Sequence, residues 1–367
     1  MVRLAVIGCG RIAELVHLPA LVAMPEVRIV AIADPEPTRR NVVQRFVPGA
    51  RAFADAETLL AACDVDGVVI CVPSGEHATV AAAAFTHGRH VYLEKPIATT
   101  ADDGTRVERA WQRARTVGMT GFNVRFHPLI ESLAQLLRNG AVGEVLAVRT
   151  VFGSAARSLP PWKQRRADGG GVLLDLASHH VDLVPWLLGT QVRSVSAVTR
   201  SVRHEDDAAA LQLECADGVV AQLLVSAGSR DEQQVEVVGS RATVRVVRGA
   251  MRQPELVVAT DAHPRWTRLR RALGALDPRL HVVAPWRDPS HARALATFVA
   301  AIRGAPLDYP TIADGRRSLE VVLAAEQSAA TGVRVACAPP LAAEPMPAEP
   351  MPARAPAPAA PAGGARS

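Results

Sequence analysis

The chain has 367 residues, of which 49% are apolar and 21% charged, and its formal net charge is +5. This length suits about two domains, and the composition is that of an ordinary globular enzyme. The basic residues form no concentrated stripe with interleaved aromatic residues, which excludes a dedicated nucleic-acid-binding protein. Charged residues interrupt every apolar stretch, so we expect no transmembrane helix.

The five cysteines are scattered and include no CxxC pair, which argues against a zinc site or a disulfide framework. We therefore expect no metal and a reducing, cytoplasmic location. The chain enters a strand-like segment almost at once, which leaves no room for a signal peptide. Residues 338–367 are mostly Pro, Ala, Glu and Arg. Such a segment buries too little apolar surface to offset its ordering entropy, and we predict a disordered tail.

Residues 1–123 alternate short apolar runs with helical patterns. The runs lack polar alternation and are separated by helices, which indicates a parallel sheet covered on both faces. We therefore predict an α/β, doubly wound Rossmann domain. Its expected strands cover residues 3–8, 27–34, 67–72, 90–94 and 119–123. Its expected helices cover residues 11–24, 55–63, 76–87 and 101–117.

Residues 124–337 have a different pattern. A helix over 128–138 precedes longer strand-like segments, and Asp217-Gly218 has the composition of a hairpin turn. We predict an α+β domain with a large open, mostly antiparallel sheet, followed by helices over 291–303 and 315–330. No element is assigned to 251–289. The expected strands cover residues 144–152, 192–202, 208–216, 219–226, 234–238 and 243–247.

The first strand leads into the sequence Gly8-Cys9-Gly10-Arg11-Ile12-Ala13, which fits G-x-G-x-x-A. Gly8 permits a tight turn, and Gly10 lets the backbone approach a pyrophosphate. Ala13 is small enough for close packing of helix on strand, and the helix N-terminus offers free N–H groups to phosphate oxygens. A glycine turn alone can be a simple link. The strand before it and the helix after it favour a dinucleotide site.

Asp34 ends the second strand, where a carboxylate can accept hydrogen bonds from the adenosine ribose hydroxyls. A carboxylate there repels a 2′-phosphate, so NAD is the expected cofactor. Arg39 and Arg40 follow closely and could reach a phosphate, which leaves NADP as an alternative.

The tripeptide Glu94-Lys95-Pro96 lies at the carboxyl end of a predicted strand, where ligands bind in open α/β sheets. Pro96 fixes the backbone there, with a cis bond as one option. Lys95 would then lie near the nicotinamide. Alone, the tripeptide is equally compatible with a surface lysine in a loop.

A second constellation follows three glycines, in a predicted helix between Gly169 and Asp182. At about 100° per residue, Asp175, His179 and Asp182 share one face of a regular helix. A carboxylate one turn from an imidazole can orient it and stabilise its protonated form, as a general acid or base requires. The alternative is a surface pair that supports the helix. The spacing lacks the HExxH pattern of a zinc site.

Together, the glycine turn, the E-K-P tripeptide and the G-G-G-x-x-x-D-x-x-x-H-x-x-D helix resemble the Gfo/Idh/MocA oxidoreductases over roughly residues 1–335. The segment CVPSGEHA (71–78) resembles the family's T-P-N-x-x-H, with Ser74 where Asn is common. GFNVRF (121–126) resembles a strand-ending segment whose Asn123 and Arg125 would face the cleft.

The resemblance implies roles for these residues. Lys95 would hydrogen-bond the reacting oxygen, His179 would act as general acid/base, and Asp175 would bind substrate hydroxyls and orient His179. The open sheet would mediate a homodimer or tetramer. The cofactor would contact Gly8, Gly10, Arg11, Ile12, Asp34, Pro73, His77, Glu94 and Lys95.

The favoured function is an NAD(P)-dependent dehydrogenase or reductase that moves hydride between nicotinamide and a carbon of a cyclic polyol, sugar or sugar nucleotide. One alternative is NAD-assisted elimination or glycoside cleavage. Another is a non-catalytic dinucleotide-binding regulator, which would need none of the three catalytic residues. A basic loop precedes the glycines and is either solvated or part of the pocket; there it would favour a phosphorylated or nucleotide-linked sugar. Its candidate residues are Trp162, Lys163, Arg165 and Arg166.

Overall fold

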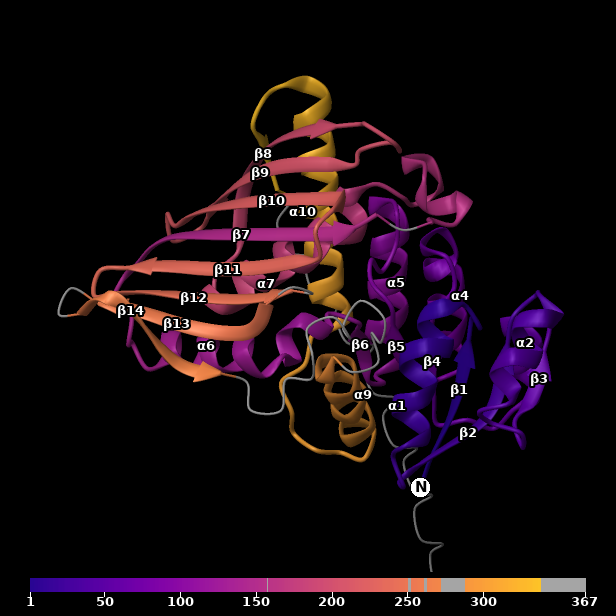
Figure 1. Ribbon diagram of the computed structural model, residues 1–367. Coiled ribbons are helices and arrows are strands. Elements are labelled where there is room, and N and C mark those ends of the chain that lie inside the picture. The colour runs from indigo at the N-terminus through magenta and orange to yellow at the C-terminus, as the bar shows by residue number, and fades with distance from the viewer. Residues whose placement is uncertain (157, 250–251, 261–262, 272–287, 338–367) are drawn as a thin grey trace, which may run out of the picture.

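The computed structural model describes residues 1–156, 158–249, 252–260, 263–271 and 288–337. The tail expected at 338–367 lies outside the described residues, as does much of the unassigned stretch. Two sheets stand side by side, joined by helices (Figure 1). Within the described residues, no helix is both long and apolar enough to span a membrane.

The first sheet is parallel throughout and has six strands in the order β3-β2-β1-β4-β5-β6. This confirms the doubly wound α/β prediction. The strands are β1 Val2–Ile7, β2 Val27–Ala33, β3 Arg51–Phe53, β4 Gly67–Ile70, β5 His90–Leu93 and β6 Gly118–Thr120. The helices are η1 Ala13–His17, α1 Leu18–Val22, α2 Pro37–Gln44, α3 Ala56–Ala62, η2 Ser74–Glu76, α4 His77–Thr86 and α5 Ala101–Ala114.

Local signals explain where these helices begin. The Asp55 carboxylate accepts a hydrogen bond from the Thr58 backbone N–H at 2.7 Å, so Asp55 caps α3. Thr100 caps α5 in the same way. Helix α2 contains Arg39 and Arg40, in keeping with the solvated helix that is their alternative role, whereas the short strand β3 was not predicted because it is brief and largely exposed.

The second sheet has nine strands in the order β14-β13-β12-β11-β7-β10-β9-β8-β15. Only β7 and β10 pair in parallel, which confirms a mostly antiparallel sheet. Strands β13 and β14 fall in the stretch to which the sequence assigned no element. The strands are β7 Val145–Ala155, β8 Val192–Arg200, β9 Ala208–Cys215, β10 Val220–Ser229, β11 Glu232–Gly239, β12 Ala242–Gly249, β13 Arg252–Thr260, β14 His263–Arg271 and β15 Val335–Ala336.

Helices cover one face of this sheet and leave the other face open towards the viewer in Figure 1. The three that lie behind it are α6 Pro128–Arg138, α7 Ser178–Leu188 and α10 Ile312–Thr331. The boundaries of α6 match the sequence prediction. The π-helical turn η6 Leu173–Ala177 runs directly into α7.

Two late helices tie the sheets together. Helix α9, Pro289–Ile302, packs on the first sheet, where Leu295, Phe298 and Val299 join its core. Helix α10 contacts α5, α7 and β8. Its first turn lies so close to the first sheet that a Cβ on Gly315 would collide with Ile97 and Thr120. The chain therefore returns to the first sheet after β14 and then adds the last strand, β15, to the second sheet.

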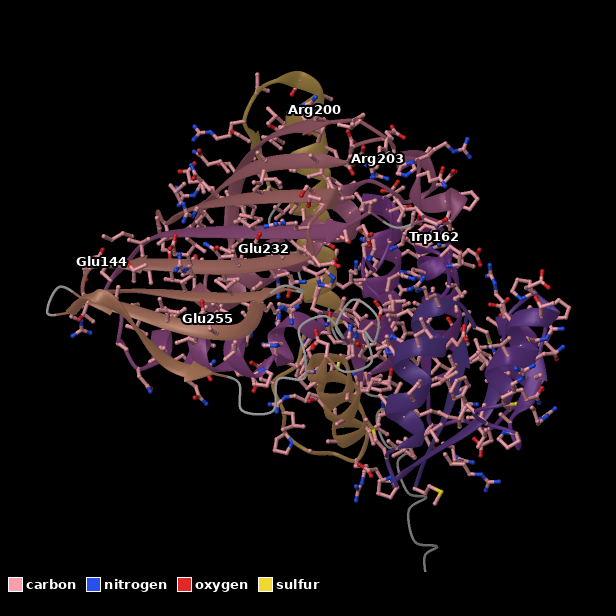
Figure 2. All side chains as sticks on the ribbon, in the orientation of Figure 1. Glu144, Trp162, Arg200, Arg203, Glu232 and Glu255 are labelled. Atoms are coloured by element: carbon pink, nitrogen blue, oxygen red, sulfur yellow. The ribbon has the colours of Figure 1, made fainter. Side chains whose placement is uncertain are left out.

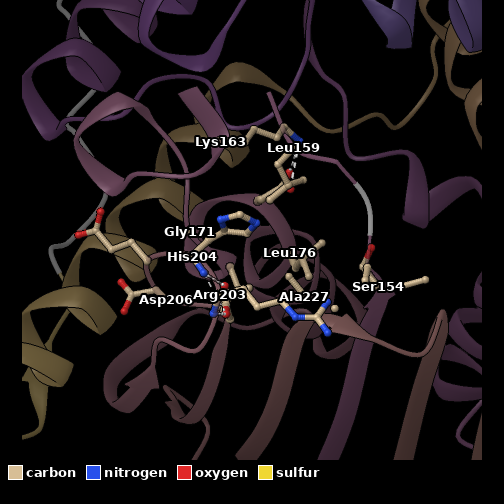
Figure 3. Close-up of a pocket in the computed structure, with 16 residues that line it drawn as sticks. Ser154, Leu159, Lys163, Gly171, Leu176, Arg203, His204, Asp206 and Ala227 are labelled. Carbon is tan, nitrogen blue, oxygen red and sulfur yellow. Dashed lines mark hydrogen bonds and ion pairs between the residues drawn. The ribbon is translucent and has the colours of Figure 1, made fainter. Parts of the chain in front are cut away.

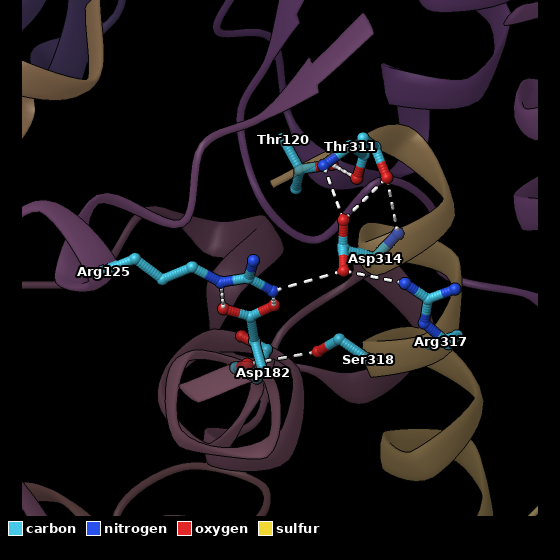
Figure 4. Close-up of polar contacts among 8 residues, drawn as sticks. Thr120, Arg125, Asp182, Thr311, Asp314, Arg317 and Ser318 are labelled. Carbon is cyan, nitrogen blue, oxygen red and sulfur yellow. Dashed lines mark hydrogen bonds and ion pairs between the residues drawn. The ribbon is translucent and has the colours of Figure 1, made fainter. Parts of the chain in front are cut away.

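A buried ion cluster connects the turn η3 (Asn123–Phe126) with α7 and α10 (Figure 4). Arg125, in the turn η3 Asn123–Phe126, binds both carboxylate oxygens of Asp182, with Nε to Oδ2 at 2.8 Å. Its Nη2 also lies 3.4 Å from Oδ1 of Asp314, which accepts a hydrogen bond from Arg317 at 2.8 Å. The Arg125 and Asp182 side chains are only 7% and 2% exposed.

This cluster corrects two sequence interpretations. Asp182 binds Arg125 instead of joining Asp175 in one site, and the π-helical turn η6 places Asp175 out of the regular helical spacing that the prediction assumed. Arg125, expected to face the cleft, is committed to Asp182 and Asp314 instead.

Replacing Asp182 with Asn should lower the free energy of unfolding by about 3–5 kcal/mol, because a buried guanidinium loses its counter-charge. Burial raises the pKa of the Asp182 carboxyl to about 6, so urea unfolding should be measured at pH 8, where this group is ionised. Glu131→Gln, in the exposed pair with Arg293, is the control and should cost less than about 1 kcal/mol. Equal losses for the two variants would contradict this account.

Candidate active site

The glycine turn after β1, Gly8-Cys9-Gly10, borders an open space; we call this turn the glycine cradle. Gly8 has φ +92°, and a Cβ there would lie 2.6 Å from the carbonyl carbon of Cys71, so this position requires glycine. A Cβ on Gly10 would meet nothing within 4 Å. The space above Gly10, beside the helix N-terminus at Arg11 and Ile12, is where the G-x-G-x-x-A pattern puts a pyrophosphate.

Asp34 lies beside this turn and is 5% exposed. Its carboxylate accepts hydrogen bonds from the backbone N–H groups of Cys9 at 2.8 Å and Glu36 at 2.9 Å. The guanidinium of Arg40 donates to the carbonyl oxygens of Asp34 and Pro35, at 2.5 and 3.1 Å. The carboxylate is thus fixed at the edge of the cradle, and Arg40 is engaged by the backbone.

His77 connects two predicted cofactor segments. Its ring nitrogens lie 2.6 Å from the carbonyl oxygen of Pro96 and 2.9 Å from that of Val72, the neighbour of Pro73. Burial lowers the pKa of His77, although the two carbonyl groups oppose this effect. The Lys95–Pro96 bond is cis, as the sequence allowed.

Two lysines converge on one carboxylate. Lys95 Nζ lies 3.0 Å from Oδ1 of Asp175 and 2.6 Å from its carbonyl oxygen. Lys163 Nζ lies 2.9 and 3.0 Å from the two carboxylate oxygens. Burial alone would raise the pKa of Asp175, but the two ammonium charges hold it well below its usual range. Asp175 is therefore a permanent anion that joins the first sheet to the helix before α7.

His179 lies in an apolar setting next to this cluster. Its ring centroid is 6.5 Å from that of Phe122 and 5.7 Å from that of Phe152, and the residue is 9% exposed. Burial and then the charge of Lys95 lower its pKa well below 6.5, and Asp175 opposes them only in part. Asp175 thus favours the protonated form of His179, as expected, but burial and Lys95 outweigh it, and His179 is neutral near pH 7.

The orienting contact predicted between Asp175 and His179 is also absent. Within the described part of the chain, Nδ1 of His179 has no hydrogen-bond partner, while the Asp175 carboxylate is occupied by the two lysines. The four-residue spacing predicted a contact between Asp175 and His179 on the assumption of a regular α-helix. A wider π-helical turn lies between them instead.

The sequence did not predict that His17, Glu94 and His291 lie together next to Lys95. His17 Nε2 lies 2.8 Å from Glu94 Oε1, and the Lys95 N–H donates to Glu94 Oε2 at 3.3 Å. Burial would raise the pKa of Glu94, but His17 and its neighbours lower it to about 2. His291 completes the trio and receives a hydrogen bond from Asn123 at 3.1 Å. The three come from distant segments, so no sequence spacing indicated them.

Side-chain atoms of His17, Glu94 and His291 lie within 4.8 Å of one another, which is the sort of grouping that can bind a metal ion. However, His17 and the Lys95 N–H already occupy the Glu94 oxygens, and Asn123 occupies Nε2 of His291. Asn123 therefore supports His291 and Ser290, to which it also donates at 2.7 Å.

The basic side chains of the loop before the glycines have different partners. Lys163 enters the site, with its ammonium 5.3 Å from the centre of the Trp162 ring. Arg165 pairs with Asp168 on the surface, and its side chain is 72% exposed. Arg166 pairs with Glu326 of α10. The structure thus brings Lys163 to Asp175 and directs both arginines elsewhere.

A pocket opens beside Asp175, at the ends of β7 and β10 (Figure 3). Its volume is about 70 Å³. Lys163 and Asp175 form one wall, and the loop between β8 and β9 forms another. The small residues at the strand ends leave the space between them; they are Ser154, Ala155, Ala156, Ala227 and Gly228.

Comparison with known proteins agrees with this geometry. Residues 2–122 match the model of an oxidoreductase family with an NAD-binding Rossmann fold, and 130–245 match the GFO/IDH/MocA C-terminal domain. An inositol 2-dehydrogenase of Rhizobium meliloti (strain 1021) is 28% identical, over 90% of this chain and 97% of that protein. The dTDP-3,4-didehydro-2,6-dideoxy-alpha-D-glucose 3-reductase of Actinomadura kijaniata is 34% identical, over 60% of this chain and 67% of that protein.

Among solved structures, a provisionally assigned myo-inositol dehydrogenase from Sinorhizobium meliloti 1021 is 26% identical, with a TM-score of 0.76. The match covers 92% of this chain and 100% of that one. The fold and the glycine cradle therefore define an NAD-binding oxidoreductase. The chain belongs to the Gfo/Idh/MocA family, as its motifs predicted, and it is an NAD(P)-dependent dehydrogenase or reductase acting on CH–OH groups.

The two cradle glycines should respond differently to alanine. Gly8→Ala should lower the free energy of unfolding by about 1–3 kcal/mol or more, because it adds both backbone strain and a clash with Cys71. Gly10→Ala should leave the unfolding midpoint unchanged but weaken NAD binding about tenfold or more, since its Cβ would point where the pyrophosphate approaches. Differential scanning calorimetry and a fluorescence titration with NADH measure the two effects. Undiminished affinity in Gly10→Ala would contradict the assigned cradle.

Proposed function

We propose that the enzyme uses Lys95, Asp175 and His179 to oxidise a hydroxyl group of a cyclic polyol, sugar or sugar nucleotide, or to reduce the corresponding ketone. The observation that carries this proposal is the Lys95 ammonium, held 3.0 Å from the Asp175 carboxylate in the cluster that also contains His179. The relatives named for an inositol and for a dTDP-linked sugar support the substrate class.

Each side chain has one task in this proposal. Bound NAD would supply the acceptor for the hydride that leaves the carbinol carbon. His179, which burial keeps neutral, takes the hydroxyl proton. The Lys95 ammonium stabilises the negative charge that develops on the same oxygen. Asp175 holds Lys95 and Lys163 in place, and its remaining lone pairs can accept hydrogen bonds from neighbouring substrate hydroxyls.

NAD should bind in preference to NADP. The Asp34 carboxylate is fixed at the end of β2, where it would accept from ribose hydroxyls and repel a 2′-phosphate. Arg40, the nearest candidate for a phosphate contact, donates to the backbone instead.

His179→Ala should reduce kcat about 100-fold or more, because the proton acceptor is lost, while the Kd for NADH stays within about twofold of the wild type. The assay is NADH formation at 340 nm with a panel of polyols and sugars. It separates net oxidation from an elimination that returns its hydride and leaves absorbance unchanged.

The matched control is His180→Gln. His180 lies on the same helix, but its Nδ1 lies 2.8 Å from the Thr150 hydroxyl, outside the lysine cluster. This variant should keep most of its turnover. If His179→Ala remained active, or lost NADH affinity instead of turnover, the role proposed for His179 would be wrong.

We further propose that the open face of the nine-stranded sheet joins two copies of the chain. Strand pairing aligns Val198, Ala210, Leu224 and Val151 in one row across β8, β9, β10 and β7. Val198 and Leu224 are 66% and 52% exposed. A continuous apolar patch of this kind is typical of a protein interface.

The double variant Val198→Lys/Leu224→Lys should shift the protein from dimer or tetramer to a smaller species, because it places charges at the centre of the apolar row. Light scattering coupled to gel filtration measures the mass. Leu307→Lys, an exposed apolar position between α9 and α10, is the control and should leave the mass unchanged. A monomeric wild type would refute this proposal.

A further inference from the structure

The loop between β8 and β9 is unusually well anchored for an exposed segment. The Asp207 carboxylate accepts hydrogen bonds from the backbone N–H groups of Val202, Arg203 and His204. Burial alone would raise the pKa of Asp207, but these amides lower it. The loop therefore keeps a fixed shape around a permanent carboxylate.

The same loop is tied to three neighbouring segments. Val172 N–H donates to the Asp206 carbonyl oxygen at 3.0 Å, and Ala227 N–H donates to that of Asp207 at 2.7 Å. The Arg166 N–H donates to the Glu205 carboxylate at 2.7 Å. Asp206 adopts φ +52°, a conformation that side chains rarely take and that often accompanies function. These contacts fix the loop at the mouth of the pocket.

This scaffold presents a guanidinium that the protein itself does not use. Arg203 lines the pocket, and within the described residues its side chain forms no hydrogen bond or ion pair. It lies over Gly228, where an added Cβ would come within 3.5 Å of Nη1. The other arginines near the pocket, Arg165 and Arg166, are paired with Asp168 and Glu326.

The acidic side chains of the loop do not neutralise Arg203. Asp207 is occupied by backbone amides, as described above. Glu205 and Asp206 lie towards Glu326; burial raises the pKa of that carboxyl, and the charges of these two acids raise it further. In Figure 3 the Asp206 side chain points to one side of the loop and Arg203 to the side of Ala227.

We propose that Arg203 is an anion-binding subsite, so that the substrate is a sugar or polyol with a carboxylate or phosphate remote from the carbon that is oxidised. This inference rests on the proposed function, since Asp175, which holds Lys95, also lines the pocket together with Lys163 and Arg203. A planar guanidinium binds either anion through two parallel hydrogen bonds. The positive charge for an anionic substrate group, which the sequence analysis sought in Arg165 and Arg166, thus comes from Arg203 in the loop between β8 and β9.

The test compares neutral hexoses in the gluco, galacto and manno configurations with the matching hexuronates and hexose 6-phosphates. The readouts are kcat and KM from NADH formation, together with the melting temperature of the NADH complex with each sugar. The variants are Arg203→Gln and, as a matched control, Arg200→Gln, an exposed arginine at the end of β8 that does not line the pocket (Figure 2).

We expect the wild type to prefer one anionic series, and whether this is the uronates or the phosphates identifies the anion. Arg203→Gln should lower kcat/KM for that series by about 10- to 100-fold, mainly through KM, since a charged hydrogen bond is lost. Its effect on neutral sugars should stay within about twofold. Arg200→Gln should match the wild type, and the KM for the anionic sugar should rise with salt.

Two results would overturn the subsite. One is a wild type that uses neutral sugars as well as anionic ones. The other is an Arg203→Gln variant that weakens neutral and anionic members equally, which would indicate damage to the loop. If no sugar of any series were oxidised or raised the melting temperature while NADH still bound, the proposed function itself would fail and the subsite with it.

Discussion

The contact between Lys95 and Asp175 determines the organisation of the site. Lys95 follows the fifth strand of the parallel sheet, whereas Asp175 lies in the π-helical turn before α7, on the other side of the domain junction. Neither residue alone forms a catalytic centre. The remaining architecture can be understood as keeping these two groups 3.0 Å apart: α10 spans both sheets, and the Arg125–Asp182 pair fixes α7.

The charge balance around that contact sets the chemistry. Two ammonium groups and one carboxylate leave the cluster with an excess of positive charge, which suits an oxygen that becomes negative during the reaction. His179 lies beside the cluster among aromatic rings, where burial and the nearby lysine keep it neutral. A neutral imidazole next to a positive cluster is a proton acceptor already in the correct form. The same positive excess favours substrates that bring their own negative charge.

Much of this could be predicted from the sequence, because some residues leave no alternative. Gly8 is required by its left-handed φ and its close approach to Cys71, and the acidic residue ending β2 follows from the same fold. The apolar runs predicted β1, β2, β4, β5 and β6 as strands of a parallel sheet. The sequence also identified Lys95 and Asp175 as partners in one site, although they are 80 residues apart.

The parts that were missed depend on geometry that no local pattern encodes. A π-helical turn has the composition of an ordinary helix, so the sequence did not show that the spacing from Asp175 to His179 departs from that of a regular helix. Lys163, Arg165 and Arg166 lie in one short loop, and their sequence does not show which of them contacts Asp175. Lys163 does, whereas Arg165 pairs with Asp168. The return of α9 to the first sheet, which brings His291 to Glu94, is a tertiary contact between distant segments.

The most direct test of this account is a crystal structure of the complex with NADH. The account predicts that the pyrophosphate lies over Gly10 and that C4 of the nicotinamide faces the space shared by Lys95 and His179, with the Lys95–Asp175 contact intact. A nicotinamide ring directed away from Lys95, or an Asp175 carboxylate released from Lys95 when the cofactor binds, would contradict it.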